Sequence, residues 1–292
     1  MKKKLVSIVM PTYNCQNIVE DALKSVKKQT YRHIELIVVD SFSTDNTAKI
    51  ARKYAKVYSF GKDPSQKDIF ASPFQINYGM AKAKGEYVYI MDSDMRLTPT
   101  IIASCVKLME SRKVDAIIIP EESYGESFWA RCRKLERDCY DTGEISYSAA
   151  ARFVRKTVWD KLHGVDNTLG GAYDGDLQMR LNTGGYKTVK VKGKVFHYEG
   201  NLTLGKQMRK KFMYGKTVLA YLKKHKDNTS YIVKEYSLIK PDFIRNFHLL
   251  LQDPIHAIGM ICMKVAEYAS AFFGVIYSFV SHEEVKILTA KK

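Results

Sequence analysis

The sequence predicts an α/β fold in which a mostly parallel β-sheet is flanked by helices. Short runs rich in Val, Ile and Leu alternate with longer segments of helical period, which is typical of strands joined by crossover helices. The run from Ile34 to Val39 is dominated by Ile, Leu and Val, as expected for a strand that is buried on both faces. Polar residues follow three of the strands, at the edge where parallel sheets bind their ligands.

In chain order, the first part of the sequence alternates expected strands with expected helices. The strands are expected at 5–10, 34–39, 57–60 and 86–91, and the helices at 17–29, 44–54 and 74–83. From residue 98 the pattern loosens, and it indicates helices near 99–112, 125–140 and 174–181, an apolar run at 116–120, a short strand at 152–154 and one basic β-like run at 186–196. We therefore expect a main domain over residues 1–200, with halves at 1–97 and 98–200, and a helical extension over residues 201–292.

Composition places the chain among ordinary globular proteins and excludes disordered, fibrous and very small ones. Of its 292 residues, 46% are hydrophobic and 27% are charged, and Gly and Pro number only 17 and 7. The net charge of +16 is concentrated between residues 186 and 226, where twelve Lys or Arg accompany a single acid, Glu199. Such a basic segment attracts polyanions or an anionic membrane surface.

The five cysteines favour a reducing compartment, because they form no C-x-x-C pair and a chain of this size needs no disulfides. The basic start is followed by an apolar run, 5–10, that is too short for a signal sequence, so we expect the N-terminus to be folded structure. The expected location is therefore the cytoplasm.

The C-terminal extension combines a basic amphipathic segment, 205–225, with an apolar segment, 255–281. Its first part places apolar residues at helical spacing among Lys and Arg, as in a helix that lies in a membrane interface. These apolar residues are Met208, Phe212, Leu219 and Leu222. The second part contains Lys264 and Glu267, and its uncharged stretch of 14 residues is short for a membrane span. For the basic segment we favour a membrane contact over a solvated helix face, and we expect no nucleic-acid partner, because no nucleic-acid-binding motif accompanies the charge. For the apolar segment we favour helices that lie in the membrane interface or pack on protein over a tilted membrane span with an internal Lys264/Glu267 pair.

Asp92-Ser93-Asp94 follows the fourth expected strand and places two carboxylates near one point. Carboxylate oxygens suit Mg²⁺ or Mn²⁺, which can bridge the diphosphate oxygens of a substrate. Taken alone, this D-x-D pattern is a weak signal, because Asp and Ser also favour simple turns. The other motifs in the chain decide between these interpretations.

Five motifs occur in order over about residues 5–197, roughly two thirds of the chain. They are V-S-I-V-M-P-T-Y-N (6–14), Q-T-Y-x-x-I-E-L-I-V-V-D with S-T-D-N-T (29–47), N-x-G-x-x-x-A-x-G-E-Y-V (77–88), D-S-D (92–94) and D-G-D-L-Q-M-R-L (174–181). By these motifs the chain resembles the family 2 glycosyltransferases, which have the Rossmann-like GT-A fold. The resemblance implies that residues 1–97 form the nucleotide-sugar-binding half of a catalytic domain and that residues 98–200 form its acceptor-side half.

The resemblance also implies roles for individual residues. Nucleotide-sugar contacts are expected from Pro11, Tyr13, Asp40, Asn77, Asp92 and Ser93, with Asp40 accepting from the base and Asp92 near the ribose. Asp94 is expected to bind Mg²⁺ or Mn²⁺, and His197 to supply a further metal or diphosphate contact, with an ordinary structural histidine as the alternative. Asp174 is expected to be the general base that takes the proton from the acceptor hydroxyl. Arg180 either contacts the diphosphate or acceptor, or forms a structural salt bridge.

Several positions depart from the family pattern. Ser41-Phe42 replaces the usual Asp-Gly, Ile76 a common Arg, Met95 a common Asp, and Tyr173 the usual Glu before Asp174. These changes concern the nucleotide contacts and the identity of the donor, and they leave the acidic residues of the mechanism in place. Cys15 stands where polyprenyl-phosphate sugar synthases usually carry Glu, which argues against that subgroup.

We therefore expect an inverting, metal-dependent transferase that moves a sugar from a nucleotide diphosphate sugar, with UDP-sugars favoured, to a hydroxyl group. The expected acceptor is a glycan or a lipid-linked or cell-surface glycan precursor, and the expected location is peripheral, on the cytoplasmic face of the cell membrane. One alternative is a polyprenyl-phosphate sugar synthase, whose acceptor phosphate needs little help from a base. The other is a non-catalytic, membrane-associated scaffold that keeps the fold.

Overall fold

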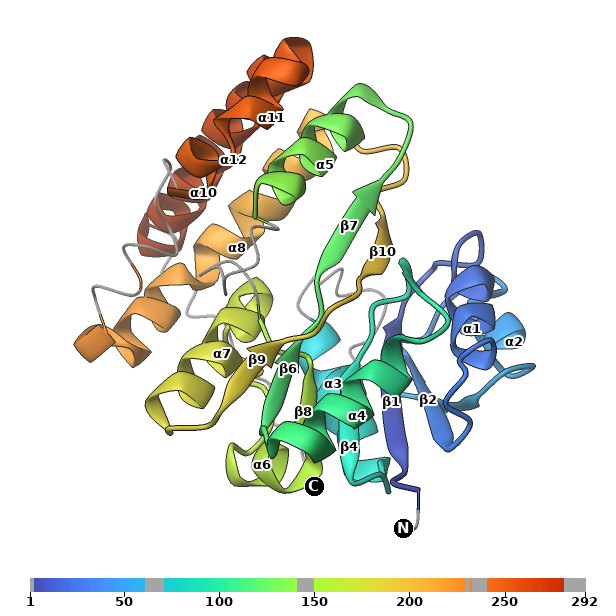
Figure 1. Cartoon of the computed structure of the whole chain (residues 1–292). Coiled ribbons are helices and arrows are strands. Elements are labelled where there is room, and N and C mark those ends of the chain that lie inside the picture. Colours follow the sequence, from blue (N-terminus) through green and yellow to red (C-terminus); the bar gives the residue numbers. More distant parts are fainter. Residues whose placement is uncertain (1–2, 61–70, 141–149, 229–231, 233–240, 281–292) are drawn as a thin grey trace.

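The computed structural model describes residues 3–60, 71–140, 150–228, 232 and 241–280, and it confirms a mixed α/β fold with a mostly parallel central sheet flanked by helices (Figure 1). The strands are β1 (Val6–Thr12), β2 (Ile34–Asp40), β3 (Lys56–Ser59), β4 (Tyr87–Ile90), β5 (Met95–Leu97), β6 (Ala116–Ile118), β7 (Glu121–Tyr124), β8 (Phe153–Arg155), β9 (Thr188–Lys190) and β10 (Val195–Tyr198). The helices are α1 (Val19–Lys27), α2 (Thr47–Ala51), α3 (Ala71–Lys82), α4 (Ile101–Arg112), α5 (Phe128–Tyr140), α6 (Lys156–Lys161), α7 (Tyr173–Thr183), α8 (Leu204–Lys224), α10 (Pro241–Arg245), α11 (Phe247–Gln252) and α12 (Pro254–Val280), with short 3-10 helices η1 (Gly170–Ala172) and η2 (Lys226–Asn228). The expected alternation of strands and helices in residues 1–97 is confirmed.

The strands form two sheets. The larger has seven strands in the order β3-β2-β1-β4-β8-β6-β9, and the smaller has three in the order β5-β10-β7. In the larger sheet, β1 pairs in parallel with β2 and β4, whereas β8 runs antiparallel between β4 and β6. The smaller sheet joins short segments from both halves of residues 1–200. Its strand β5 ends at Leu97, in the first half, and pairs with β10, which begins at Val195 in the second half.

One prediction for this region was wrong, because residues 186–196 do not form a single β-run. β9 joins the larger sheet beside β6, and β10 joins the smaller sheet between β5 and β7. Between them lies Gly193, whose φ of +116° is a backbone conformation that favours glycine. β5 and β7 were not predicted, because strands of three or four residues depend more on their partners than on their own sequence.

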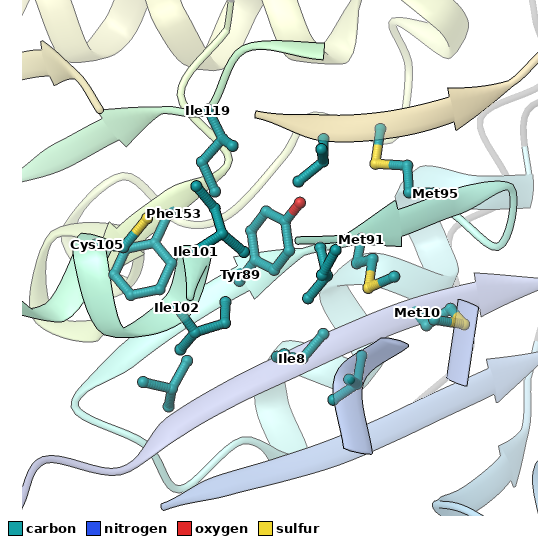
Figure 2. Close-up of a cluster of buried hydrophobic side chains, with 14 of the residues drawn as sticks. Ile8, Met10, Tyr89, Met91, Met95, Ile101, Ile102, Cys105, Ile119 and Phe153 are labelled. Atoms are coloured by element: carbon teal, nitrogen blue, oxygen red, sulfur yellow. The ribbon is translucent and has the colours of Figure 1, made fainter. Parts of the chain in front are cut away.

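The larger sheet is buried on both faces. On one face Ile8, Met10 and Tyr89 pack against α1 and α4 (Figure 2). On the other face Val9 and Ile90 pack against α3, α6 and α7. Successive side chains of a strand point to opposite faces, so both sets of positions in β1 and β4 must be apolar. This double burial explains why these strands are almost continuous apolar runs in the sequence.

The antiparallel direction of β8 brings its first residues to the edge where β1, β2 and β4 end. The Ile90 N at the end of β4 donates a hydrogen bond of 3.0 Å to the carbonyl oxygen of Arg152, just before β8. At the same edge Thr12, the last residue of β1, pairs with Asp40, the last residue of β2. Residues from four strands therefore meet at this edge.

The C-terminal helices pack on the rest of the protein, with α12 lying along α8 and contacting α5 (Figure 1). Only glycine fits where α8 and α12 cross. A Cβ atom at Gly215 would lie 2.1 Å from the carbonyl oxygen of Ala271, and one at Gly274 would lie 2.0 Å from that of Phe212. These two glycines allow the helix backbones to approach closely.

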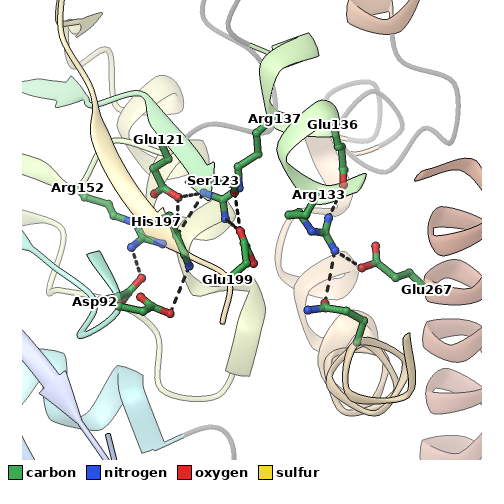
Figure 3. Close-up of polar contacts among 12 residues, drawn as sticks. Asp92, Glu121, Ser123, Arg133, Glu136, Arg137, Arg152, His197, Glu199 and Glu267 are labelled. Carbon is green, nitrogen blue, oxygen red and sulfur yellow. Dashed lines mark hydrogen bonds and ion pairs between the residues drawn. The ribbon is translucent and has the colours of Figure 1, made fainter. Parts of the chain in front are cut away.

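Two buried ion pairs join α12 to α5. Lys264 Nζ lies 2.6 Å from Glu136 Oε1. Glu267 pairs with Arg133, as Figure 3 shows. The charged residues inside the apolar segment 255–281 therefore face protein. The opposite side of α12 exposes a row of large apolar side chains: Ile255, Ile258, Ile261, Val265, Phe272, Phe273, Ile276, Phe279 and Val280.

The apolar side of α8 is partly covered by α12, but Met208 and Leu222 on it remain 37% and 38% exposed, so the expected membrane contact of this segment stays a prediction. The Phe212 ring packs 5.7 Å from the Tyr277 ring, and Ser270 Oγ donates a hydrogen bond of 2.6 Å to the carbonyl oxygen of Met208. By length and composition alone α12 could cross a membrane. Its contacts with α5 and α8 agree with the favoured expectation of a helix that lies in the membrane interface or packs on protein.

Candidate active site

Asp40, the predicted contact of the nucleotide base, is buried at the end of β2. Its Oδ1 accepts hydrogen bonds from Thr12 Oγ1 (2.9 Å) and Ser43 Oγ (2.6 Å), and its Oδ2 accepts one from Ser43 N (2.8 Å). These bonds fix the carboxylate where β1 and β2 end. The contact with a base stays a prediction.

Pro11, Tyr13 and Ser93 lie close to the same edge. Pro11 is buried within β1, whereas Tyr13, the first residue after β1, is exposed. Hydrogen bonds between the loops that follow β1 and β2 hold the two loops together. Ser93, in the loop after β4, lies within hydrogen-bonding reach of the Cys15 thiol. Three loops that were predicted to bind the nucleotide sugar therefore meet.

Arg152 connects Asp92 with Asp174. Its Nη1 donates a hydrogen bond of 2.5 Å to Asp92 Oδ2, which Figure 3 shows, and its Nη2 donates one of 2.7 Å to Asp174 Oδ2. Asp92 follows β4, Arg152 precedes β8, and Asp174 lies in the first turn of α7. The predicted ribose contact and the predicted general base therefore share one guanidinium group.

The second oxygen of Asp174, Oδ1, is buried and has no hydrogen-bond partner among the residues that the structure describes. Burial raises the pKa of Asp174; Arg152 opposes this rise, and the negative charges of Asp92 and Glu121 add to it. A carboxylate with a raised pKa and one free oxygen has the properties of a general base.

His197 lies between two carboxylates (Figure 3). Its Nε2 is 3.3 Å from Asp94 Oδ2, and its Nδ1 is 3.1 Å from Glu121 Oε2. The pairing of β10 with β5 sets this position, with Tyr198 N donating to the carbonyl oxygen of Asp94 at 2.9 Å. Burial lowers the pKa of His197, but the hydrogen bonds to Asp94 and Glu121 outweigh burial and raise the pKa to about 9.

The surroundings of Asp94 fit a divalent cation. Its Oδ1 is buried and finds no hydrogen-bond partner within the described part of the chain, and carboxylate oxygens are ligands that Mg²⁺ and Mn²⁺ prefer. His197 Nε2 would be a second ligand once its proton has left, with Nδ1 held by Glu121. Over the described ranges no group of three or more His, Cys, Asp or Glu side chains that could hold a metal ion is found.

Two other predicted site residues are held by contacts within the fold. Asn77 Nδ2 donates to the carbonyl oxygen of Val165 (2.7 Å), and Asn77 Oδ1 accepts from Val165 N (3.0 Å). Arg180 donates through Nε to Asp176 Oδ2 (2.8 Å) and through its other nitrogens to two backbone carbonyls ahead of α7. For Arg180 the structural salt bridge is therefore the contact observed, and for Asn77 the nucleotide contact stays a prediction.

Three charged residues near this edge were not assigned to the site from the sequence: Arg152, Glu121 and Lys210. Lys210 on α8 belongs to the basic segment 205–225, which was expected to contact a membrane surface, yet its pKa is raised by Tyr214 and by the Asp94 carboxylate. Part of the basic segment therefore lies near the acidic residues. The sequence did indicate a short strand at 152–154, but it did not indicate the antiparallel pairing with β4 that brings Arg152 to this edge.

Comparison with known proteins shows which protein family the sequence matches. Residues 7–162 match the family model described as Glycosyl transferase family 2, and residues 87–279 match the one described as Glycosyl transferase family group 2. The chain is 31% identical over 124 residues to the glycosyltransferase GlyG of Streptococcus pneumoniae, which covers 42% of this chain and 41% of GlyG. It is 32% identical over 158 residues to the UDP-Glc:alpha-D-GlcNAc-diphosphoundecaprenol beta-1,3-glucosyltransferase WfaP of Escherichia coli, which covers 51% of this chain and 57% of WfaP. The chain thus spans less than two thirds of the length of these curated relatives.

Solved structures share the fold. The mannosyltransferase PcManGT from Pyrobaculum calidifontis, in complex with GDP-Man and Mn²⁺, superposes with a TM-score of 0.62 at 16% identity, over 92% of this chain and 87% of that one. S. aureus TarS 1–349 in complex with UDP-GlcNAc gives a TM-score of 0.53 at 15% identity, over 95% and 92% of the two chains. At these identities the likeness concerns the fold alone, and it confirms the GT-A architecture.

Proposed function

The chain belongs to glycosyl transferase family 2, and on that premise we propose that it transfers a sugar from a nucleotide diphosphate sugar to an acceptor hydroxyl group. The transfer inverts the configuration of the anomeric carbon. The acceptor is a glycan or a lipid-linked or cell-surface glycan precursor; the name of WfaP, which describes a lipid-linked acceptor for that relative, supports this class. UDP-sugars are the favoured donors.

The observation that carries this proposal is the environment of Asp174. Its Oδ2 is held by Arg152, whereas its buried Oδ1 has no partner among the described residues. Arg152 links Asp174 to Asp92 in the loop that follows β4, at the edge of the sheet where we propose that the nucleotide sugar binds. An alcohol is a weak nucleophile, so a carboxylate within hydrogen-bond reach assists its attack.

In the proposed step, the acceptor oxygen forms a bond to the anomeric carbon while Asp174 Oδ1 takes the hydroxyl proton. The bond between the anomeric carbon and the diphosphate oxygen breaks on the opposite side, and its electron pair leaves with the nucleoside diphosphate. Lys210, whose pKa is raised by Tyr214 and the carboxylates of Asp94 and Asp92, offsets the negative charge of the leaving group.

Asp94 and His197 would hold Mg²⁺ or Mn²⁺, and diphosphate oxygens would complete the coordination of the ion. When bound, the cation supplies charge neutralisation at the departing diphosphate. For the rest of the donor we propose contacts with Pro11, Tyr13, Asp40, Asn77, Asp92 and Ser93, as the family resemblance implies. Asp40 is held in one orientation by Thr12 and Ser43, which suits a fixed acceptor for the base.

The test begins with a thermal-shift panel of UDP-, GDP- and dTDP-sugars with and without Mn²⁺, because a ligand that binds the folded state raises the Tm. One nucleotide class should raise the Tm in a Mn²⁺-dependent manner, and Asp94→Ala should abolish that shift. Asp174→Asn should keep the shift but lower kcat by about 10²- to 10⁴-fold in a transfer assay. Near-normal turnover of Asp174→Asn on a polyprenyl phosphate would favour the synthase instead. If the wild-type protein shows neither nucleotide-sugar binding nor sugar transfer, the non-catalytic scaffold becomes the better hypothesis.

We also propose a peripheral location on the cytoplasmic face of the cell membrane, with the outer side of α12 as the contact. That side exposes Ile, Val and Phe residues along the helix, while the opposite side is bound to α5 and α8. Helices with one apolar side and nearby Lys and Arg bind at the boundary of headgroups and acyl chains. The proposal places the site of transfer next to a lipid-linked acceptor.

A further inference from the structure

Arg152 reaches the candidate site through the direction of its strand. It immediately precedes β8, which runs antiparallel to β4, and its carbonyl oxygen accepts a hydrogen bond from the N of Ile90 at the end of β4. Its side chain is only 16% exposed. A buried arginine needs anionic partners, because the guanidinium group stays charged.

The two partners of Arg152 come from different parts of the chain. Asp92 belongs to residues 1–97, expected to bind the donor, and Asp174 belongs to residues 98–200, expected to bind the acceptor. Arg152 uses separate nitrogens for the two carboxylates, which the fixed fork of a guanidinium permits and a single ammonium group does not. Glu121 adds a third negative charge nearby and helps to raise the pKa of Arg152.

The contact determines which oxygen of Asp174 is available. Arg152 occupies Oδ2, and Oδ1 is the buried oxygen without a partner among the described residues. A carboxylate held by one oxygen keeps the other in a fixed direction. Arg152 also opposes the effects of burial and of the negative Asp92 and Glu121, all of which favour a protonated Asp174.

We propose that Arg152 is a positioning residue for sugar transfer: it fixes Asp174 with Oδ1 directed at the acceptor hydroxyl and ties this base to donor-side Asp92. This role rests on the proposed function, in which Asp174 is the general base. Arg152 itself takes no proton and forms no bond with the substrates. A purely structural role would instead require only that Arg152 stabilise the fold.

The experiment compares Arg152→Met, which removes the charge, with Arg152→Lys, which keeps the charge and loses the fork. Arg155→Met is the matched control, because Arg155 is the last residue of β8 and donates to the carbonyl oxygens of Val114 and Met109. For each protein the kcat, the KM of the donor, the pH profile of kcat and the Tm are measured.

We expect Arg152→Met to lower kcat about 100-fold while the donor KM changes less than about threefold. Among the described residues, the charged groups that act on Asp174 most strongly are Arg152, Asp92 and Glu121, and Tyr214 of α8 packs on Gly171 just before α7. Removing the Arg152 cation makes Asp174 easier to protonate, so the acidic limb of the pH profile should move up by about one pH unit or more. Compared with Arg152→Met, the Arg152→Lys variant should bring the acidic limb part of the way back to its wild-type pH. It should restore a smaller part of the lost kcat.

Three results would overturn the proposal. The first is an acidic limb that Arg152→Met leaves in place, with activity falling only as the folded fraction falls. The second is a raised donor KM at unchanged kcat, which would make Arg152 a donor-binding residue. The third is an equal shift of the limb in Arg155→Met.

The failure of the proposed function is distinguishable from these results. If the wild-type protein transfers no sugar, the carboxyl titration of Asp174 can still be followed by ¹³C NMR in the wild-type protein and in Arg152→Met. A higher Asp174 pKa in the variant would support the electrostatic part of the inference without any assay of activity. An unchanged titration would overturn it.

Discussion

His225 at the end of α8 and Asp176 on α7 form a buried contact, with His225 Nε2 2.8 Å from Asp176 Oδ1. The same oxygen lies 2.7 Å from Lys224 Nζ, and Oδ2 accepts hydrogen bonds from Arg180. Asp176 is fully buried and lies two residues after Asp174. One carboxylate therefore ties α8 to the helix that carries the candidate base.

Replacing Asp176 with Asn should lower the free energy of unfolding by about 3 to 5 kcal/mol, because it leaves buried basic groups without their counter-charge. Urea unfolding measures this change. Asp160→Asn is the control, since Asp160 pairs with Lys156 at the surface and should matter by less than about 1 kcal/mol. The Asp176 variant that remains folded should still bind the donor. Lost donor affinity at unchanged stability would indicate that Arg180 contacts the donor after all.

The crossing of α8 and α12 depends on the absence of a side chain at Gly274. Gly274→Val should force the helices apart and destabilise the protein by about 1 to 3 kcal/mol, since its Cβ would overlap the Phe212 carbonyl oxygen. Gly205→Ala is the matched control, because a Cβ there meets no atom within 4 Å. Equal stability of the two variants in chemical denaturation would show that the crossing is looser than the structure indicates.

Lys211 gives the protein a defined pH dependence. Burial lowers its pKa from 10.5 to about 8, and Glu267 offsets this only in part. Between about pH 8 and 10.5 the unfolded chain holds this proton and the folded chain does not, so the contribution of Lys211 to stability rises with pH through that window.

Lys211→Met should therefore raise the Tm at pH 7, by about 2 to 4 °C for a gain on the order of 1 kcal/mol. The advantage of the variant should shrink as the pH approaches 10. Thermal unfolding of both proteins from pH 7 to 10 measures the difference, in which the titration of all other lysines cancels. A difference that is the same at every pH would contradict the lowered pKa of the partly buried Lys211 ammonium group.

Local sequence was sufficient for the residues that directly follow the parallel strands. Asp40, Asp92 and Asp94 lie at one edge because the apolar runs before them are strands of one parallel sheet. Arg152 and Glu121 reach the same region through an antiparallel strand and through the smaller sheet. Pairings between distant short strands leave no periodic pattern in the sequence, so neither residue could be assigned from it.

The amphipathic pattern of residues 205–225 correctly predicted a helix but not what covers its apolar side. Hydrophobic spacing has the same form whether the partner is lipid or another helix. Phe212 packs on Tyr277 of α12, and the close approach depends on Gly215 and Gly274, which the pattern does not weigh. The fold of the segment was thus predictable and its contact surface was not.

The location of the membrane contact gives the last prediction, which separates α12 from α8. Phe272 and Phe273 are 62% and 61% exposed on α12, and Leu222 is 38% exposed on α8. The double variant Phe272→Glu/Phe273→Glu should weaken sedimentation with anionic phospholipid vesicles at least about 10-fold, because each buried Phe contributes about 1.5 to 3 kcal/mol. Leu222→Glu should bind vesicles as the wild-type protein does. If Leu222→Glu weakens vesicle binding and the double Phe variant does not, the membrane contact lies on α8. If the wild-type protein does not bind vesicles, the proposed peripheral location is wrong.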